Sequence, residues 1–242
     1  MNEKTLKITF AGQAGYIIET NTGYRVGIDL YLSDCCNSLY GLKRLMPFVY
    51  APTELSLDLL VATHEHEDHF DPDSVPLIMA TRKTTLLCTP DCKKTAQSLG
   101  LDNSRITYVE TGDVYENRHV KITAMPCDHG DEAPYAVGLL IEADGKRIYV
   151  AGDTCFRENY FSNPLVSGVD MFIMPINGAF GNLDEYEGAR AAGIVKAGLT
   201  VPCHYWCFAG HLGNPQRFID EMDEKYPDLN YNLMRIAETV EL

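Results

Sequence analysis

The sequence predicts an α/β fold in which two β-sheets pack face to face and helices cover their outer sides, an αββα sandwich. Strand-like segments come first and helical segments follow, and this order occurs twice along the chain. The length of 242 residues suits one large α/β domain or two small ones, and we expect a single domain over 1–242. Periodicity alone would also allow other α/β arrangements.

The first half of the chain is rich in short strand-like segments. They are apolar or alternating and are separated by turn residues such as Asn-Thr-Gly, and they lie at 5–10, 15–20, 24–30, 57–63, 85–89 and 105–109. Residues 33–56 are less regular and include two prolines, so we expect a loop there. Asp71 and Pro72 are typical of an N-cap and a first helical position, which predicts a helix that starts at this point. A second helix is expected at 91–100.

The second half repeats this order. The expected strands are 119–125, 135–142, 146–151, 169–174 and 199–203. Helices at about 184–197 and 214–226 flank the last of these strands. The two halves would each contribute a sheet and the helices that cover it.

Composition narrows the classes of function. The formal net charge is −14, and such an acidic surface repels polyphosphate backbones, which disfavours a nuclease without excluding one. No apolar run approaches the roughly 18 residues that a membrane span needs, and no signal peptide is recognisable. We therefore expect a cytoplasmic protein with a small-molecule substrate, and neither nucleic acid nor a membrane as partner. The eight cysteines are expected to be reduced and structural, least securely Cys155, which lies two residues from a candidate ligand.

The strongest chemical signal is the segment that follows the apolar strand at 57–63. His64, His66, Asp68 and His69 lie within six residues, and the segment holds three of the seven histidines. Side chains two apart at an extended strand end point the same way, so His64 and His66 can share one metal ion. Asp68 and His69 can reach a second ion beside it. Imidazole and carboxylate ligands suit zinc, iron or manganese.

Three further candidate ligands come directly after apolar strands. They are His129, Asp153 and His204. Each one alone would more safely be given a structural role, but their order after the motif favours metal ligation. His119 begins a strand beside Arg118 and is expected at the surface.

The motif His64-Glu-His66-Glu-Asp68-His69, a later His, then Gly-Asp-Thr and a late His resemble the pattern of the metallo-β-lactamase superfamily. The resemblance implies two mixed sheets with helices outside and a site for two metal ions. The ligands that it implies are His64, His66 and His129 for one ion, Asp68, His69 and His204 for the other, and Asp153 as a bridge between them.

Several short patches are similar to the L-ascorbate-6-phosphate lactonase family. They are Pro47-Phe48-Val49, residues 57–71, Ala151 to Thr154, Tyr160, and the stretch 201–215 that includes Trp206. The chain is much shorter than those lactonases, and the context of His129 is nearer to the general superfamily pattern. This resemblance implies manganese and self-association, whereas His and Asp ligation in the superfamily usually implies zinc. We therefore expect one or two divalent ions, Mn²⁺ or Zn²⁺, per chain.

Together these features predict a metal-dependent hydrolase. Two divalent ions lower the pKa of a shared water and produce a hydroxide, which attacks an ester, lactone, amide or phosphoryl centre. Asp153 would bridge the ions, and Asp68 would orient the nucleophile or take its proton. The predicted substrate is a small polar or phosphorylated sugar-derived lactone.

Substrate contacts are harder to assign. Arg157, four residues after Asp153, is the first candidate for an anionic group, and Lys43 and Arg44 are weaker ones. Further candidates for the pocket are Tyr160, Asn177, Trp206 and His211. For most of these side chains, a packing or surface role is about as probable as substrate contact.

Three other functions were weighed against this prediction. A phosphodiesterase or nuclease could use the same ligands, but would need a basic surface or a substrate-binding arm. A di-iron redox protein usually replaces a motif ligand by a carboxylate and carries a flavin domain, whereas position 66 is His and the chain leaves no room for such a domain. A metal-binding protein without catalysis is disfavoured by the complete ligand set.

Overall fold

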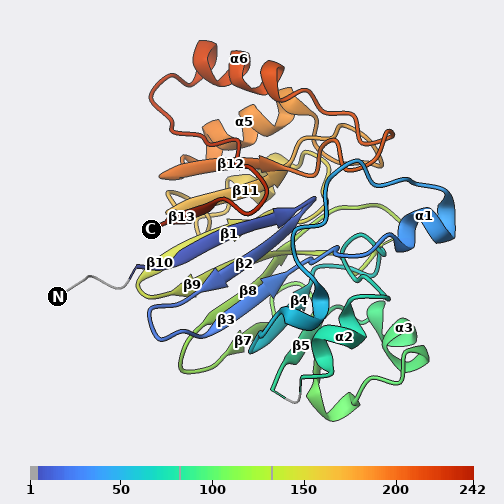
Figure 1. Ribbon diagram of the computed structural model, residues 1–242. Coiled ribbons are helices and arrows are strands. Elements are labelled where there is room, and N and C mark those ends of the chain that lie inside the picture. The colour runs from blue at the N-terminus through green and yellow to red at the C-terminus, as the bar shows by residue number, and fades with distance from the viewer. Residues whose placement is uncertain (1–4, 82, 132) are drawn as a thin grey trace.

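The computed structural model describes residues 5–81, 83–131 and 133–242, which form four layers (Figure 1). Two β-sheets pack against each other, and helices cover the outer face of each sheet. The predicted α/β fold with two mixed sheets and helices outside is therefore confirmed.

The first sheet has seven strands in the order β13-β1-β2-β3-β4-β5-β6. Their bounds are Lys7–Gly12 (β1), Gly15–Glu19 (β2), Arg25–Ile28 (β3), Leu59–Ala62 (β4), Thr85–Cys88 (β5), Ile106–Tyr108 (β6) and Thr239–Glu241 (β13). β13, β1, β2 and β3 pair antiparallel, and β3 to β6 pair parallel. The chain ends beside its own beginning, because β13 pairs with β1.

The second sheet has six strands in the order β12-β11-β10-β9-β8-β7. Their bounds are Val114–Glu116 (β7), Lys121–Pro126 (β8), Val137–Ala143 (β9), Lys146–Val150 (β10), Met171–Pro175 (β11) and Leu199–Cys203 (β12). β7 to β10 pair antiparallel, and β10 to β12 pair parallel. Both sheets are mixed, and the parallel strands adjoin the helices that connect them.

The main core lies between the sheets. Alternate residues of each strand face the opposite sheet, as the period of two along a strand requires. Ile8, Ile18 and Val61 of the first sheet belong to the same buried cluster as Ile141 and Ile173 of the second. Burial of this apolar surface is the dominant favourable contribution to stability. The same packing holds the two sheets in a fixed position relative to each other.

Helices cover the two outer faces. α5 (Glu185–Val195) and α6 (Pro215–Lys225) lie over β11 and β12, while α2 (Val75–Met79) and α3 (Cys92–Ser98) lie over β4 and β5 (Figure 1). The remaining helical segments are α1 (Cys35–Tyr40), α4 (Glu158–Phe161), η1 (Pro52–Glu54) and η2 (Asn103–Arg105). None of the described helices is long and apolar enough to cross a membrane.

Capping residues explain where the two long helices begin. Asp184 accepts a hydrogen bond from the backbone N–H of Glu187, and the Glu187 side chain accepts one from the backbone N–H of Asp184, which is a capping box. Asn214 caps α6, and Pro215 occupies its first turn, where no backbone donor is needed. Both helices therefore start within one residue of the positions that the sequence predicts.

Two local predictions differ from the structure, and two short strands were not predicted. The helix expected from Asp71 begins at Val75, after a turn over residues 72–74. Asp71 still acts as the expected cap, because its carboxylate accepts hydrogen bonds from the backbone N–H groups of Asp73 and Ser74. The same carboxylate also accepts from those of Leu32 and Ser33. The expected loop at 33–56 contains α1 and η1. The short strands β7 and β13 were not predicted, since three residues are too few for a recognisable pattern.

The eight cysteines are all free thiols. Six are buried, and Cys127 and Cys155 are partly buried. Burial raises the pKa of both Cys127 and Cys155, which keeps them in the less reactive thiol form.

Strand direction positions the candidate site. β3, β4, β8, β10, β11 and β12 all end at the same edge of the sandwich, and the loops that follow them meet there. Ligand sites of open α/β sheets form at such carboxyl edges.

Candidate metal centre

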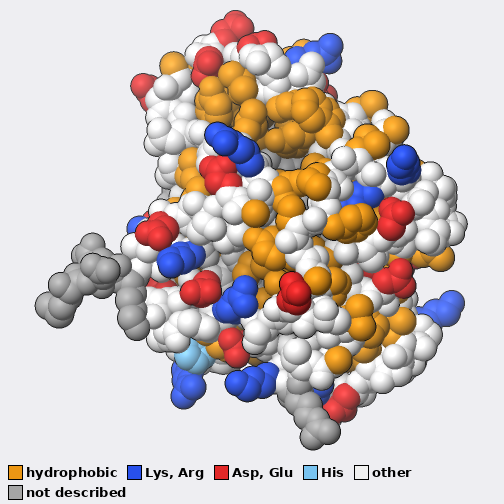
Figure 2. Space-filling view, in the orientation of Figure 1, with side chains coloured by type: hydrophobic (Ala, Val, Ile, Leu, Met, Phe, Trp, Pro, Cys, Tyr) orange, Lys and Arg blue, Asp and Glu red, His pale blue; other side chains and the backbone are white. Residues whose placement is uncertain are grey.

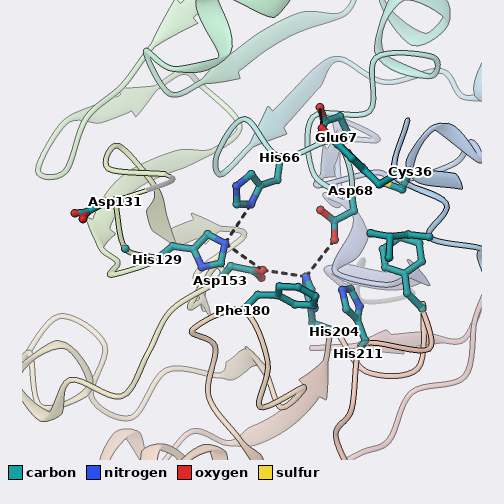
Figure 3. Close-up of a pocket in the computed structure, with 14 residues that line it drawn as sticks. Cys36, His66, Glu67, Asp68, His129, Asp131, Asp153, Phe180, His204 and His211 are labelled. Atoms are coloured by element: carbon teal, nitrogen blue, oxygen red, sulfur yellow. Dashed lines mark hydrogen bonds and ion pairs between the residues drawn. The ribbon is translucent and has the colours of Figure 1, made fainter. Parts of the chain in front are cut away.

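The first group of candidate ligands consists of His64, His66 and His129. His64 and His66 follow β4, and His129 follows β8 in the other sheet. His66 Nδ1 lies 3.2 Å from His129 Nε2 (Figure 3) and 3.0 Å from His64 Nε2. One ligand atom of each residue lies within 4.8 Å of the others.

The second group consists of Asp68, His69 and His204, again with ligand atoms within 4.8 Å of one another. His69 Nε2 lies 3.1 Å from His204 Nε2, and Asp68 Oδ2 lies 3.5 Å from His204 Nε2. The His69 side chain is 1% exposed and that of Asp68 15%, so Asp68 is the more accessible of the two.

Asp153 lies between these groups. Its carboxylate is 3.0 Å from His204 Nε2, 3.5 Å from His69 Nε2 and 3.8 Å from His129 Nε2. It also forms a third close group with His64 and His69. The structure thus gathers all seven predicted ligands, in the two sets of three and the central carboxylate that the resemblance implied.

This donor set fits cations. His66 Nδ1 faces two imidazole nitrogens, and a single ring proton can satisfy only one of those contacts. These three ring nitrogens converge on one point, where a bound cation could accept a lone pair from each. Five imidazoles with two carboxylates suit zinc or manganese.

Charge coupling inside the cluster shifts the acids and the bases in opposite directions. Burial alone would lower the pKa of His204, but the carboxylates of Asp153 and Asp68 raise it to about 9. Burial likewise opposes ionisation of Asp153, yet His204 and His69 hold the pKa of its carboxyl well below the usual range. Burial lowers the pKa of His64. Without metal, protons on His69 and His204 balance the carboxylates, so a cation must displace protons to bind.

Asp29 supports the second group and was missed from the sequence. Its carboxylate lies 2.9 Å from His69 Nδ1 and accepts hydrogen bonds from both the backbone N–H and the hydroxyl of Thr63. A carboxylate in this place fixes the tautomer and orientation of a ligating His. Asp29 directly follows β3, as other candidates follow their strands, and this position could have indicated it.

Gln13 was also missed, and no sequence signal marks it. It lies in the tight turn between β1 and β2, with a positive φ of 58°, and is fully buried. Its Nε2 donates a 2.6 Å hydrogen bond to Asp68 Oδ2 and lies 2.8 Å from His204 Nε2. Asn182 plays a similar part on the other side, since its Nδ2 donates to Asp153 Oδ2 at 2.7 Å.

A cavity of about 600 Å³ opens in front of the cluster. Among the described residues its charged lining is entirely acidic, and the apolar part of its wall comes from α1, the following loop and two phenylalanines. The residues that line the cavity are Cys36, Tyr40, Leu42, His66, Glu67, Asp68, His129, Gly130, Asp131, Asp153, Phe180, His204, Phe208 and His211. This volume suits a small-molecule ligand.

Of the predicted substrate contacts, only His211 lines this cavity. Asn177 and Trp206 line a neighbouring cavity of about 530 Å³, to which His211 also contributes. Tyr160 lines neither of these cavities.

The basic residues predicted to hold an anion are not placed at the cavity. Arg157 forms a 2.7 Å ion pair with Asp128 instead. Arg44 is buried, donates to the carbonyl oxygen of Tyr31 and stacks on the rings of Tyr31 and Phe48. Lys43 is exposed and does not line the cavity.

Comparison with known proteins supports a metal-dependent site in this fold. A family model described as the Beta-lactamase superfamily domain matches residues 30–205. The chain is 29% identical to a UPF0173 metal-dependent hydrolase of Thermococcus onnurineus, over 78% of this chain and 88% of that protein. It is 28% identical to a UPF0173 metal-dependent hydrolase of Anoxybacillus flavithermus, over 98% and 100%. Among solved structures, Igni18, a metallo hydrolase from Ignicoccus hospitalis, is similar with a TM-score of 0.77, 22% identity and 98% coverage of both chains.

Proposed function

This chain belongs to the metallo-β-lactamase superfamily, and from that premise we propose that it is a metal-dependent hydrolase of lactones or related carboxylic esters. The observation that carries the proposal is the pair of three-residue ligand groups with Asp153 between them, beneath an open cavity. The names of the UPF0173 relatives, which are metal-dependent hydrolases, support the general class of reaction.

The residues divide the work between two ions. His64, His66 and His129 would hold one ion, Asp68, His69 and His204 the other, and Asp153 would contact both. When bound, such ions polarise a substrate oxygen and lower the pKa of water towards neutrality. The identity of the ions, Mn²⁺ or Zn²⁺, is part of the proposal.

Asp68 is the acidic side chain best placed to meet a reacting water. It lines the cavity, and Gln13 holds its carboxylate in one orientation. Burial alone would raise the pKa of Asp68, but His69 and His204 lower it far below the usual range. A carboxylate of such low basicity orients a water by accepting its hydrogen bond more readily than it removes the proton.

His211 completes the polar lining beside His204, with the two ring centroids 4.6 Å apart (Figure 3). Burial and the neighbouring His204 lower its pKa to about 3, so the ring is neutral at physiological pH. A neutral imidazole can donate an N–H hydrogen bond to a substrate oxygen without adding charge. We assign His211 this orienting role.

The proposal is tested with a substrate panel. Protein loaded with Mn²⁺ or Zn²⁺ is offered neutral lactones, phosphorylated sugar lactones and a phosphodiester reporter. Turnover of a lactone that chelators abolish is the expected result. Cleavage of the phosphodiester without any lactone turnover would replace the lactonase by a phosphodiesterase.

The face of the molecule drawn in Figure 2 gives the phosphodiesterase or nuclease alternative little support. On the face drawn in Figure 2, basic and acidic side chains are interspersed around a band of hydrophobic ones, and no continuous basic stripe is visible. A protein that binds nucleic acid would need such a stripe.

A further inference from the structure

The cavity combines an apolar wall with an acidic floor. Cys36, Tyr40, Leu42, Phe180 and Phe208 supply the apolar surface. The charged residues are Glu67, Asp68, Asp131 and Asp153, and no lysine or arginine appears among the described lining residues. Bound ions would neutralise Asp68 and Asp153, but Glu67 and Asp131 lie outside the ligand groups.

Phe180 is the most unusual part of this wall. It is 62% exposed, although a phenylalanine normally contributes to stability by being buried. Its φ is 56°, in the left-handed region that favours glycine, and Gly178 and Gly181 on either side have φ values of 59° and 79°. The chain thus holds a large apolar ring in an unfavourable backbone conformation, outside all four hydrophobic clusters.

The ring of Phe180 is directed at the site. Its centroid lies 5.7 Å from that of His211 in an edge-on arrangement, and Figure 3 shows it beside Asp153 and His204. The fold gains little from this placement, whereas a ligand in the cavity would cover the ring.

Phe208, a second aromatic lining residue that also contacts His211, is firmly supported. Phe208 packs edge-on against Tyr31 and against His211, with centroid distances of 5.7 and 4.7 Å. The backbone N–H of Leu45 donates to the carbonyl oxygen of Cys207 at 2.8 Å, which ties the loop after α1 to the loop after β12. An apolar substrate group that enters the cavity therefore meets Phe180 together with a firmly supported Phe208.

The charges of the cavity lining also favour an uncharged substrate over a phosphorylated one. A phosphate placed away from the ions would face Glu67 and Asp131 without any neighbouring cation in the described lining. Glu67 accepts a 2.7 Å hydrogen bond from the Tyr40 hydroxyl, but a phenol leaves its negative charge in place. Two uncompensated carboxylates in the cavity lining therefore disfavour a further anion there.

We infer that the natural substrate is an uncharged lactone or ester with an apolar group of several carbons, which packs against Phe180. The inference rests on the proposed function and narrows it, because it excludes phosphorylated sugar lactones as the preferred substrates. Phe180 is then a specificity-determining residue.

Product-like carboxylates test this without relying on turnover. Calorimetry on the Zn²⁺-loaded protein compares butyrate with octanoate, and gluconate with 6-phosphogluconate. We expect octanoate to bind at least tenfold more tightly than butyrate, about 1.4 kcal/mol, because its longer chain buries more apolar surface. We expect 6-phosphogluconate to bind no more tightly than gluconate.

Variants locate the effect. Phe180→Ala should reduce the octanoate-to-butyrate ratio at least fivefold, while Phe180→Leu should keep most of it. Leu165→Ala removes a side chain of similar exposure, 54%, that does not line the cavity, and should leave the ratio unchanged. Equal metal content in all variants shows that the site itself is intact.

The outcomes separate the two proposals. Equal binding of butyrate and octanoate, tighter binding of 6-phosphogluconate than of gluconate, or an unchanged ratio in Phe180→Ala would overturn the inference, even if short lactones are hydrolysed. A retained preference for octanoate without hydrolysis of any lactone would refute the proposed reaction and support the apolar ligand class.

Discussion

At the scale of single residues, His66 is a partly buried member of the ligand cluster. His64 is fully buried behind it, and His129 belongs to the other sheet, so His66 connects the motif loop with the second half of the molecule. Removing its ring leaves the first ion with two of its three imidazoles, whereas the second group is untouched.

We expect His66→Ala to abolish hydrolysis and to reduce bound zinc towards one ion per chain, as measured by elemental analysis after gel filtration. His119→Ala is the matched control, because His119 stacks on Tyr24 and hydrogen-bonds to Thr22, away from the cluster. Full activity of His66→Ala would remove His66 from the ligand set.

Gln13 acts on the second group through a carboxylate and an imidazole at once. Its amide donates to Asp68 and lies against His204, so its loss leaves both ligands less constrained. We expect Gln13→Ala to weaken zinc binding at one of two sites by roughly 10- to 100-fold, the usual effect of removing a supporting partner. Chelator competition measures this affinity, and two unchanged binding steps would contradict the role.

At the scale of secondary-structure elements, the end of β10 depends on a glycine. Gly152 precedes Asp153 and has a φ of 69°, and a Cβ there would lie 2.6 Å from the carbonyl oxygen of Val137 in β9. The chain can therefore turn Asp153 towards the cluster only because position 152 carries no side chain.

Gly152→Ala should lower the free energy of unfolding by about 2 kcal/mol or more and reduce metal binding, since backbone strain and a clash act together. Gly145→Ala isolates the strain: its φ is 77°, but no atom lies within 4 Å of the added Cβ. Its expected cost is about 1 kcal/mol. Thermal unfolding of both variants gives the comparison, and equal losses would mean that the clash is relieved elsewhere.

At the scale of the whole molecule, the metal-free protein should lose stability as the pH rises from 7 to 9. In the folded protein the pKa of His204 is about 9, and that of His69 is also raised. The two protonated histidines therefore contribute fully to the free energy of unfolding below about pH 6.5, and this contribution is lost as they deprotonate at higher pH. His64, His129 and His211 have lowered pKa values, so between pH 7 and 9 they are largely neutral in both the folded and the unfolded chain. They therefore add little to the pH dependence of the stability there.

Melting temperatures of metal-free protein between pH 7 and 9 test this, and zinc-loaded protein is the control. In the same window the apparent zinc affinity should rise, because the ions no longer compete with protons on His69 and His204. A flat or rising stability of the metal-free protein would show that these two histidines are not paired with the carboxylates as described.

The sequence by itself was enough to predict the fold class, which the structure confirms, and to propose seven metal ligands, which the structure brings together. Apolar strands ending in His64, His129, Asp153 and His204 could be recognised because strand periodicity and metal-ligand chemistry both act over a few neighbouring residues. The capped starts of α5 and α6 were predictable for the same reason. The lactone substrate and the self-association of the chain stay predictions.

Only the tertiary structure decided what surrounds the ligands. Gln13 reaches His204, 191 positions away, because the two sheets pack face to face, and Asp29 reaches His69 because β3 and β4 are neighbours in the first sheet. Arg157 lies close to Asp153 in the sequence, but its side chain forms an ion pair with Asp128 instead. Phe180 becomes part of the cavity through a glycine-flanked loop that meets His211. Such contacts depend on packing between distant segments, and a pattern along the chain does not encode them individually.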